Sequence, residues 1–273
     1  MSKEPLIIAN WKCNPASKKE AEHLFGVLKK ELKKTKNTEI VICPPFIWMD
    51  TARKLGFQAV SRLGNQVSKF AIQLGGQNCF WENRGAFTGE VSPLMLKNLG
   101  CEFVIIGHSE RKKYFQESDL IINKKLKAVL KNRLQPILCV GEEARDAFTA
   151  EGKPLNEMSL VVGEQVEKGL SGISSSRLSE IVITYEPVWA IGTGMPCLPN
   201  DAMKAALLIR KTLTNLYSRN IAEKVRIIYG GSVNSQNASD YIKGAAMNGL
   251  LIGGASLNAS EFVKIVKDVE EIL

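Results

Sequence analysis

Residues 181–194 read IVITYEPVWAIGTG, a stretch that joins a strand pattern to a carboxylate and a glycine-containing end. Its first part, Ile181 to Tyr185, is an apolar, β-branched run of strand length. The run ends at a carboxylate, Glu186, and Pro187 follows at once, which cannot continue a strand ladder. A bulky aromatic, a small apolar tip and two glycines complete the stretch. The pattern predicts a buried strand that ends at a carboxylate, beneath a hydrophobic loop with a pliable tip.

Strand-like and helix-like segments alternate along the whole chain. The predicted strands are 5–9, 39–43, 71–75, 103–106, 136–140, 180–185, 225–229 and 249–252. The predicted helices are 17–34, 46–55, 92–98, 118–132, 155–169, 200–218, 235–242 and 260–271. In the first helix Ser17 is the expected N-cap, and Glu20 is expected to complete a capping box.

This alternation predicts an α/β fold of the (β/α)8 barrel type. Strands such as 103–106 (FVII) are continuously apolar, as expected when both faces of a parallel sheet are buried. A doubly wound sheet is the alternative, but no G-x-G-x-x-G follows the first strand, which disfavours a dinucleotide fold. No linker or low-complexity tract divides the chain, so we expect one catalytic domain over residues 1–273.

Composition limits the class of protein. The chain has 273 residues, of which 45% are hydrophobic, enough to bury one large core. It has no apolar run long enough to span a bilayer, and its N-terminus lacks the features of a signal peptide. The six cysteines form no C-x-x-C pair, so neither a zinc site nor a disulfide framework is expected. We expect a cytoplasmic protein without a membrane partner. Several cysteines lie in apolar runs, such as Cys43 and Cys139, and are expected to act as small core residues.

The net charge of +8 is concentrated near the end of the first helix, in segment 29–36. The simplest interpretation is a solvated face with cations at a helix C-terminus. Steering of an anionic substrate is the alternative. Nucleic-acid binding is disfavoured because no aromatic residues are interleaved with the lysines.

In a barrel of this type the chemistry lies where the strands end. The residues that follow the first, fourth, sixth, seventh and eighth strands are Asn10-Trp11-Lys12, Gly107-His108-Ser109-Glu110, Glu186, Gly230-Gly231-Ser232 and Gly253-Gly254. A carboxylate under an apolar lid is suited to proton abstraction, and an ammonium to a developing negative charge. Glycines in such turns expose backbone N–H groups to a phosphate. We therefore expect these groups to converge on one mouth.

Each of these side chains also has a purely structural interpretation. Glu186 could form a strand-end ion pair, and His108 could be a satisfied core histidine. Lys12 could extend to solvent, and Glu110 could be a structural acid. The second histidine, His23, lies within the first helix and is expected at the surface or in packing.

Taken in order, these motifs resemble the triosephosphate isomerase family over nearly the whole chain. The matching segments are 10–12, 86–91, 107–111, 139–142, 185–194, 229–233 and 253–257. The resemblance implies a TIM barrel and a cofactor-free isomerase of glycolysis and gluconeogenesis, with no metal. Its reaction would interconvert dihydroxyacetone phosphate and D-glyceraldehyde 3-phosphate through an enediolate.

The resemblance also implies roles for single residues. Glu186 would be the base, and His108 a neutral electrophile; the family is itself the standard example of such a histidine, so that role comes from the resemblance. Lys12 would serve the enediolate and the phosphate, Asn10 would orient the substrate, and Glu110 would hold Lys12 or relay protons. Phosphate contacts are expected at Gly192, Ser232, Gly253 and Gly254. The lid would consist of Pro187, Val188, Trp189, Ala190, Ile191, Gly192, Thr193 and Gly194.

Segment 77–90 is too apolar for a free loop, since it contains Phe80, Trp81 and Phe87. The resemblance implies a homodimer in which this loop inserts into a second subunit. Thr88 would then lie near the Asn10 and Lys12 of that subunit, with Cys13 in the contact. The alternative is a loop folded over its own barrel.

The chain departs from the family pattern at a few positions. Met195-Pro196 follows the lid, Lys112 stands where a second Arg is usual, and Pro15 follows Asn14. Lys112 could weaken an ion pair at the dimer contact, since an ammonium is not equivalent to an Arg fork. Extra residues fall within 60–70. The functional alternatives are another phosphate-binding barrel, such as an aldolase, and a catalytically silent binding barrel. A Schiff-base aldolase is disfavoured because the sixth strand has no lysine.

Overall fold

The computed structural model describes residues 4–57, 72–144, 147–148, 154–155, 158–193 and 195–273. Eight parallel strands close into a barrel in the order β1-β10-β9-β8-β5-β4-β3-β2. Their bounds are β1 Leu6–Asn10, β2 Glu39–Cys43, β3 Gln73–Gly76, β4 Cys101–Ile106, β5 Gln135–Val140, β8 Val182–Tyr185, β9 Arg226–Tyr229 and β10 Gly249–Ile252. The predicted (β/α)8 fold class is therefore confirmed, and the domain bounds 1–273 stay a prediction.

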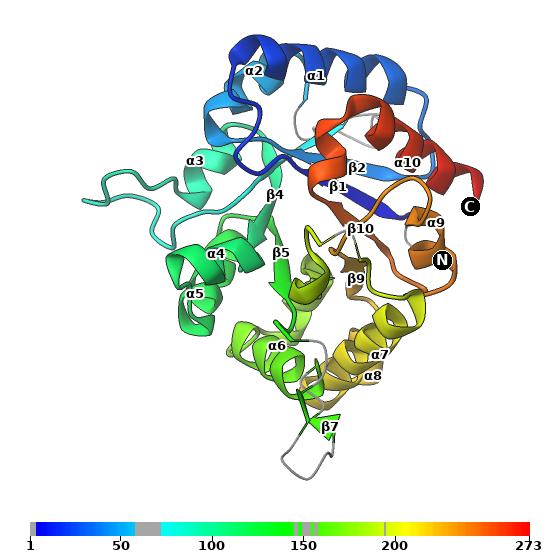
Figure 1. Ribbon diagram of the computed structural model, residues 1–273. Coiled ribbons are helices and arrows are strands. Elements are labelled where there is room, and N and C mark those ends of the chain that lie inside the picture. The colour runs from blue at the N-terminus through cyan, green and yellow to red at the C-terminus, as the bar shows by residue number, and fades with distance from the viewer. Residues whose placement is uncertain (1–3, 58–71, 145–146, 149–153, 156–157, 194) are drawn as a thin grey trace.

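Helices surround the barrel on the outside (Figure 1). The α-helices are α1 Lys18–Leu32, α2 Met49–Lys54, α3 Pro93–Asn98, α4 Ser109–Phe115, α5 Asp119–Lys131, α6 Gly163–Gly169, α7 Pro199–Leu216, α8 Arg219–Ala222, α9 Ala238–Lys243 and α10 Ala259–Glu271. The short helices are η1 Phe46–Trp48, η2 Met158–Val162, η3 Ser175–Glu180, η4 Val188–Ala190 and η5 Gly254–Leu257.

The strands separate two layers of apolar packing. Ile7 and Ala9 of β1 pack outward into one cluster with helix residues such as Phe25 and Leu28. Leu6 and Ile8 of the same strand belong to a second cluster that contains strand residues only, which is the barrel interior. Because successive side chains on a strand point to opposite faces, a continuously apolar strand fills both layers.

Cys43 and Cys139 belong to the interior cluster. Both thiols are fully buried, and burial raises their pKa well above the usual value. The expectation that these cysteines are small core residues is confirmed.

Helix starts follow the capping residues in the sequence. The Ser17 hydroxyl accepts a hydrogen bond from the Glu20 backbone N–H at 3.3 Å, which confirms the predicted N-cap of α1. Ser92 and Ser118 cap α3 and α5 in the same way. The reciprocal bond that would complete the capping box at Glu20 stays a prediction.

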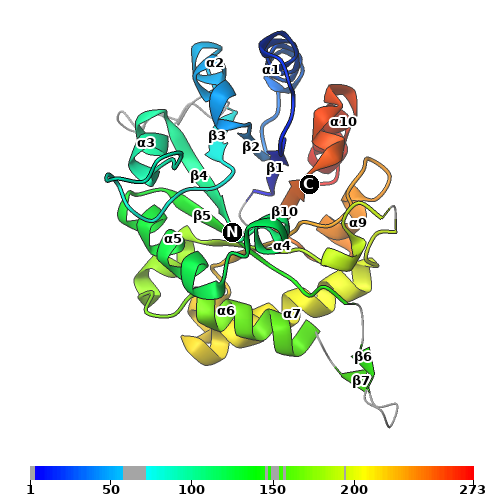
Figure 2. The same ribbon diagram turned by 60° about the vertical axis from the view of Figure 1, so that its left-hand side comes forward.

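The predicted helix 155–169 is wrong in its first half. The α-helix begins at Gly163, after a π-helical turn over Met158–Val162. Pro154–Leu155 instead pairs antiparallel with Ala147–Phe148, as strands β7 and β6. This ribbon projects from the barrel in Figures 1 and 2. The apolar period of residues 158–166 marks a buried face but not a helix start, and Val162 offers no side-chain cap.

Other observed boundaries differ from the predicted ones by a few residues. The predicted helix 46–55 divides at Trp48 into a 3-10 turn and α2. Strand β3 begins at Gln73 rather than at 71, and residue 71 and the segment 60–70 lie outside the described residues. The structure adds η3 and α8, which the sequence pattern did not predict. In the part of the chain that is described, no helix is long and apolar enough to cross a bilayer.

The aromatic packing beneath α1 gives a test of the outer core. The ring of Phe25 lies 4.5 Å from that of Trp11 and 5.0 Å from that of Phe57, between centroids. We expect Phe25→Ala to lower the free energy of unfolding by about 3–5 kcal/mol, because the cavity sits among rings that cannot collapse into it. Denaturant titration measures this. Lys19→Ala, at an exposed site on the same helix, should change stability by less than about 0.5 kcal/mol.

Candidate active site

The carboxyl ends of the strands bring the predicted site residues to one end of the barrel. Asn10 ends β1 and is 4% exposed, while Glu186 follows β8 and is 2% exposed. A Cβ placed on Gly253 would lie 3.0 Å from Lys12 Cε, so the turn after β10 adjoins the loop after β1. A Cβ placed on Gly230, after β9, would likewise lie 3.0 Å from Glu186 Cγ. The convergence expected from the barrel fold is therefore present.

The Glu186 carboxylate is held on one oxygen only. Oε2 accepts a hydrogen bond from the Ser109 backbone N–H at 3.0 Å. Oε1 lies 3.3 Å from His108 Nε2, and within the described residues it has no partner of good hydrogen-bond geometry. The result is a buried carboxylate with one anchored oxygen and one oxygen that faces an imidazole.

His108 is the N-cap of α4. Its Nδ1 accepts a hydrogen bond from the Glu110 backbone N–H at 3.2 Å. A ring nitrogen that accepts carries no proton, so the neutral ring has its proton on Nε2, the atom that faces Glu186. Local geometry therefore favours the tautomer that carries its proton on Nε2.

Lys12 is held in an unusual backbone conformation. Its φ is 53°, in the left-handed region that side chains seldom adopt. The Lys12 N–H donates to Asn10 Oδ1 at 3.1 Å, and Gln77 Nε2 donates to the Lys12 carbonyl at 2.9 Å. Gln77 was not predicted as a site residue, since a polar residue in a loop gives no local signal of this contact.

The Lys12 ammonium pairs with Glu110. Lys12 Nζ lies 2.6 Å from Glu110 Oε1, and their side chains are 26% and 41% exposed. This pair joins β1 to α4 across the mouth. The interpretation of Lys12 as a side chain that merely extends to solvent is not supported by this contact.

The first half of the predicted lid is tethered by hydrogen bonds. Trp189 Nε1 donates to Glu142 Oε1 at 2.7 Å, and the Tyr185 hydroxyl donates to the same oxygen at 2.8 Å. The Ser232 hydroxyl donates to the Ala190 carbonyl at 2.8 Å. No role was predicted for Glu142, whose only signal was its place in segment 139–142.

The tip of the lid and the turn after β10 leave backbone uncovered. Gly192 has φ of 73°, and a Cβ there would meet no atom within 4 Å. The same openness holds at Gly254, which begins η5. Gly194, the last residue assigned to the lid, lies outside the described residues.

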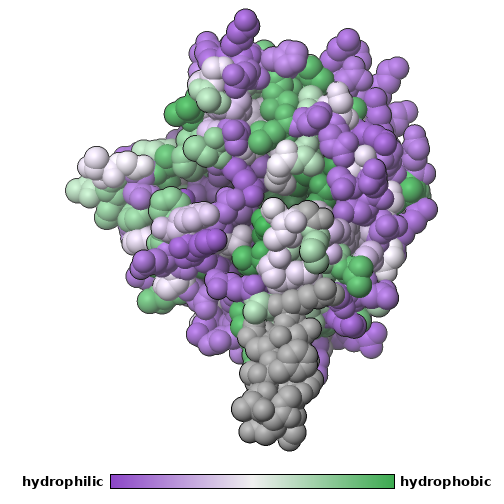
Figure 3. All heavy atoms as spheres, in the orientation of Figure 1, coloured by the Kyte–Doolittle hydropathy of each residue, from purple (hydrophilic) through white to green (hydrophobic). Residues whose placement is uncertain are grey.

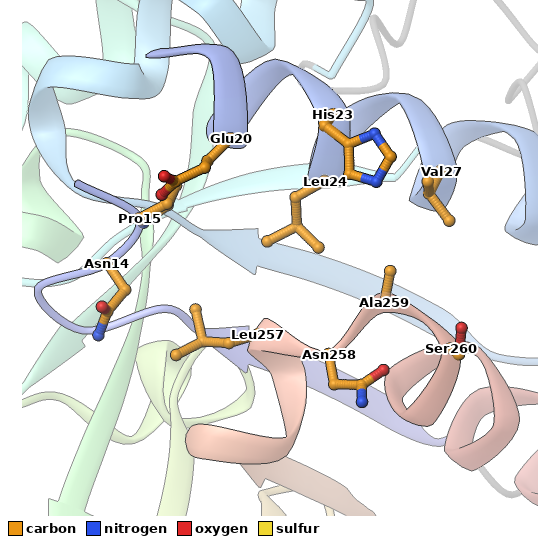
Figure 4. Close-up of a pocket in the computed structure, with 10 residues that line it drawn as sticks. All are labelled: Asn14, Pro15, Glu20, His23, Leu24, Val27, Leu257, Asn258, Ala259 and Ser260. Atoms are coloured by element: carbon orange, nitrogen blue, oxygen red, sulfur yellow. The ribbon is translucent and has the colours of Figure 1, made fainter. Parts of the chain in front are cut away.

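His23 lies apart from this constellation. It is exposed on α1 and lines a groove of about 540 Å³. Figure 4 shows side chains of α1 on one side of this groove and residues Leu257 to Ser260 on the other. None of the predicted site residues lines it. Among the residues that the structure describes, no group of three or more His, Cys, Asp and Glu side chains is arranged to hold a metal ion.

The fold and the site define a class: a (β/α)8 barrel with a buried carboxylate, a histidine and a lysine at the C-terminal mouth. Comparison with known proteins gives the family. The family model described as triosephosphate isomerase matches residues 5–269. The chain therefore belongs to the triosephosphate isomerase family, which confirms the resemblance seen in its motifs.

Relatives that carry the name triosephosphate isomerase match almost end to end. The protein from Dictyoglomus turgidum is 44% identical over 262 residues, which is 96% of this chain and 98% of the relative. The protein from Moorella thermoacetica is 42% identical over 264 residues, 97% of this chain and 98% of the relative. The protein from Aquifex aeolicus is 43% identical over 261 residues, 96% of this chain and 98% of the relative.

Gly141 packs so closely against the Glu186 backbone that adding one methyl group tests the contact. A Cβ added at Gly141 would collide with the Glu186 carbonyl oxygen, which is backbone and cannot move aside. We expect Gly141→Ala to lower the free energy of unfolding by about 3 kcal/mol, measured by thermal or denaturant unfolding. At Gly26 in α1 a Cβ meets nothing within 4 Å, so Gly26→Ala should be neutral or stabilising by about 0.5–1 kcal/mol. Equal stability of the two variants would contradict the close contact.

Proposed function

We propose that this chain catalyses the interconversion of dihydroxyacetone phosphate and D-glyceraldehyde 3-phosphate, a step of glycolysis and gluconeogenesis. Membership of the triosephosphate isomerase family supports the reaction. The observation that carries the proposal is the pair of Glu186 Oε1 and His108 Nε2, 3.3 Å apart at the barrel mouth. A carboxylate base and a neutral acid on neighbouring elements are the groups that a proton transfer next to a carbonyl requires.

Glu186 is proposed as the base. Its carboxylate removes a proton from one carbon of the triose phosphate, and the electron pair left behind forms the enediolate. The carboxylic acid then returns the proton to the neighbouring carbon. Anchoring of Oε2 by the Ser109 N–H leaves Oε1 for this transfer. Burial keeps water away from the carboxylate and from the enediolate.

His108 is proposed as the electrophile. The Nε2 proton, directed to the mouth by the Nδ1 contact with the Glu110 N–H, polarises the substrate carbonyl. The same ring then passes a proton between the two substrate oxygens as the enediolate changes from one form to the other. Burial of the ring at 7% exposure makes each hydrogen bond stronger than it would be in water.

Lys12 and Asn10 are proposed to orient and stabilise the substrate. An ammonium beside the reacting oxygens favours the charge that develops on the enediolate and also the dianionic phosphate. The ion pair with Glu110 holds this ammonium in the mouth, which favours the holding role for Glu110 over a proton relay. Backbone N–H groups at Gly192, Ser232, Gly253 and Gly254 are proposed to bind the phosphate.

Residues 187–194 are proposed as a lid over this site. The bonds from Trp189 to Glu142 and from Ser232 to Ala190 anchor its first half, and the uncovered Gly192 gives it a pliable tip. No cofactor is needed for the proposed chemistry, because Lys12 supplies the positive charge. A cytoplasmic location stays a prediction from the sequence.

An aldolase function is disfavoured by the placement of lysines. Strand β8 carries no lysine that could form a Schiff base in the barrel. Lys125 is buried, but it belongs to α5 and is paired with Glu117 and Asn78. Both Glu186 and His108 are in place, so the silent binding barrel is likewise disfavoured.

If Glu186 is the base, kcat should depend steeply on the position of its carboxylate. Glu186→Asp withdraws the carboxylate by about 1 Å and should lower kcat on the order of a hundredfold with little change in KM, because binding of the phosphate is retained. A coupled assay with glyceraldehyde 3-phosphate measures both constants. Glu164→Asp, an exposed residue of α6 paired with Lys168, serves as the control and should have the wild-type rate. Wild-type turnover in folded Glu186→Asp would remove Glu186 as the base.

We further infer that the chain forms a homodimer through the loop between β3 and α3. This loop projects from the barrel in Figure 1, and in Figure 3 it carries pale and green residues. The Phe80 ring stacks on Trp81 at 4.0 Å and contacts Phe87 at 4.5 Å, between centroids. Phe87 is nevertheless 41% exposed, so the loop is ordered around its own rings and still presents apolar surface.

The exposed apolar side chains near this loop extend the surface. Ile47 of η1 is 72% exposed, and Met95 of α3 is 51% exposed. Both belong to segments that follow neighbouring strands, β2 and β3. Thr88 and Cys13 are also exposed, as a contact between subunits requires. A two-fold dimer would cover this surface twice.

The dimer proposal predicts loss of assembly and activity from one loop substitution. Thr88→Arg should give monomers in analytical ultracentrifugation and lose most isomerase activity, although no residue proposed for the chemistry has changed, because a charge is buried against the partner. Ser175→Arg, at an exposed site in η3, should remain dimeric and active. A wild-type protein that sediments as a fully active monomer at micromolar concentration would refute the dimer.

A further inference from the structure

Lys112 of α4 turns toward the barrel rather than toward solvent. Its ammonium donates to Gln165 Oε1 at 3.0 Å and to the Cys139 carbonyl at 3.4 Å. The residue is half-buried, and burial lowers the pKa of its ammonium. The suggestion from the sequence that Lys112 acts at the dimer contact is thus not supported by where its ammonium lies.

Gln165 links the Lys112 ammonium to the backbone after β5. Its Oε1 accepts from the Gly141 N–H at 2.8 Å, and its Nε2 donates to the Gly141 carbonyl at 3.1 Å. One side-chain amide therefore satisfies both backbone groups of a single residue. This two-point contact fixes the position and the orientation of Gly141 relative to α6.

Gly141 in turn lies against the backbone of Glu186. The absence of a side chain lets the Glu186 carbonyl pack where a Cβ would otherwise be. On either side, the Glu186 N–H donates to the Val140 carbonyl at 2.7 Å and the Val188 N–H donates to the Glu142 carbonyl at 3.0 Å. Residues 140–142 therefore form a shelf that supports Glu186 and the start of the lid.

The charged groups around this shelf include both buried and exposed side chains. Burial lowers the pKa of the Lys112 ammonium, and this lowering is partly offset by Asp119 of α5, the Glu186 carboxylate, the Cys139 thiol and Glu143 of the loop after β5. The Glu186 carboxylate faces His108 and the Ser109 N–H from α4, and the Cys139 thiol from β5. Burial raises the pKa of that thiol, and the neighbouring carboxylate raises it further, so Cys139 stays neutral.

We propose that Lys112 is a positioning residue for Glu186: through Gln165 and Gly141, its ammonium holds the shelf on which that carboxylate stands. The proposal rests on the proposed role of Glu186 as the base. Arg111, the neighbouring cation on α4, cannot substitute, because its guanidinium is paired with Glu117. Lysine suits the site, since one ammonium reaches an amide oxygen and a backbone carbonyl in different directions.

The test compares Lys112→Met with Lys112→Arg. The methionine variant should lower kcat by about fivefold or more with KM within about twofold, because Lys112 does not touch the substrate. Lys112→Arg should recover the rate, because the guanidinium can also donate to Gln165 and to the Cys139 carbonyl.

Two further variants test the path from Lys112 to Glu186. Gln165→Leu keeps the ammonium but releases Gly141, and should lower kcat by a similar factor with KM again within about twofold. Lys97→Met removes a partly buried lysine that pairs with Glu102 on the outer layer, and should leave kcat and KM unchanged. If Lys112→Met does not fold, Lys112→Gln replaces it, with the same expected fall in kcat because it also lacks the ammonium.

A wild-type rate in folded Lys112→Met or in folded Gln165→Leu would overturn the proposal. So would an equal fall of kcat in Lys97→Met, because it would report net charge rather than position. These outcomes differ from failure of the proposed function, in which the wild-type protein itself would not isomerise triose phosphates.

Discussion

Burial of the Glu186 carboxylate is the constraint on which the rest of the site depends. An ionised carboxylate withdrawn from water costs several kcal/mol unless hydrogen bonds and opposite charge replace its hydration. Here the replacement comes from the Ser109 N–H at the start of α4, with the His108 ring at Oε1. These partners lie at the start of one short helix that follows β4, and Lys112, one turn further along, is linked through Gln165 to the backbone beside Glu186. The position of α4 relative to β8 therefore sets the chemistry of the base.

The closed barrel makes that position rigid. Strands β4, β5 and β8 are neighbours, with Ile106 paired to Leu138 and Val140 paired to Tyr185. The loop after β5 lies against the Glu186 backbone, and it carries both the Gly141 contact and the Glu142 oxygen that binds Trp189 and Tyr185. One loop thus supports the proposed base and tethers the lid above it. A displacement of the proposed base is therefore expected to alter the lid, and a displacement of the lid to alter the base, because both are supported by this loop.

Lys12, on the other side of the mouth, has a strained backbone conformation. This left-handed backbone is kept in place by the bond that the Lys12 N–H donates to Asn10 and by the bond that the Lys12 carbonyl accepts from Gln77. Strained residues persist where the surroundings determine their conformation, and they are concentrated at functional sites. Glu110, from the same helix as His108 and Lys112, completes the arrangement by pairing with the Lys12 ammonium. Helix α4 therefore contacts both the proposed base and the proposed cation.

The sequence by itself determined the barrel, the order of its strands and the residues at the mouth, since period, strand-end chemistry and ordered motifs are local properties of the chain. It did not predict the β6–β7 ribbon or the late start of α6, because apolar period marks a buried face but not a helix start. Only the tertiary structure decided the histidine tautomer, the strain at Lys12 and the path from Lys112 through Gln165 to Gly141. These depend on contacts between residues far apart in the chain, such as the 53 positions between Lys112 and Gln165, which no local pattern encodes.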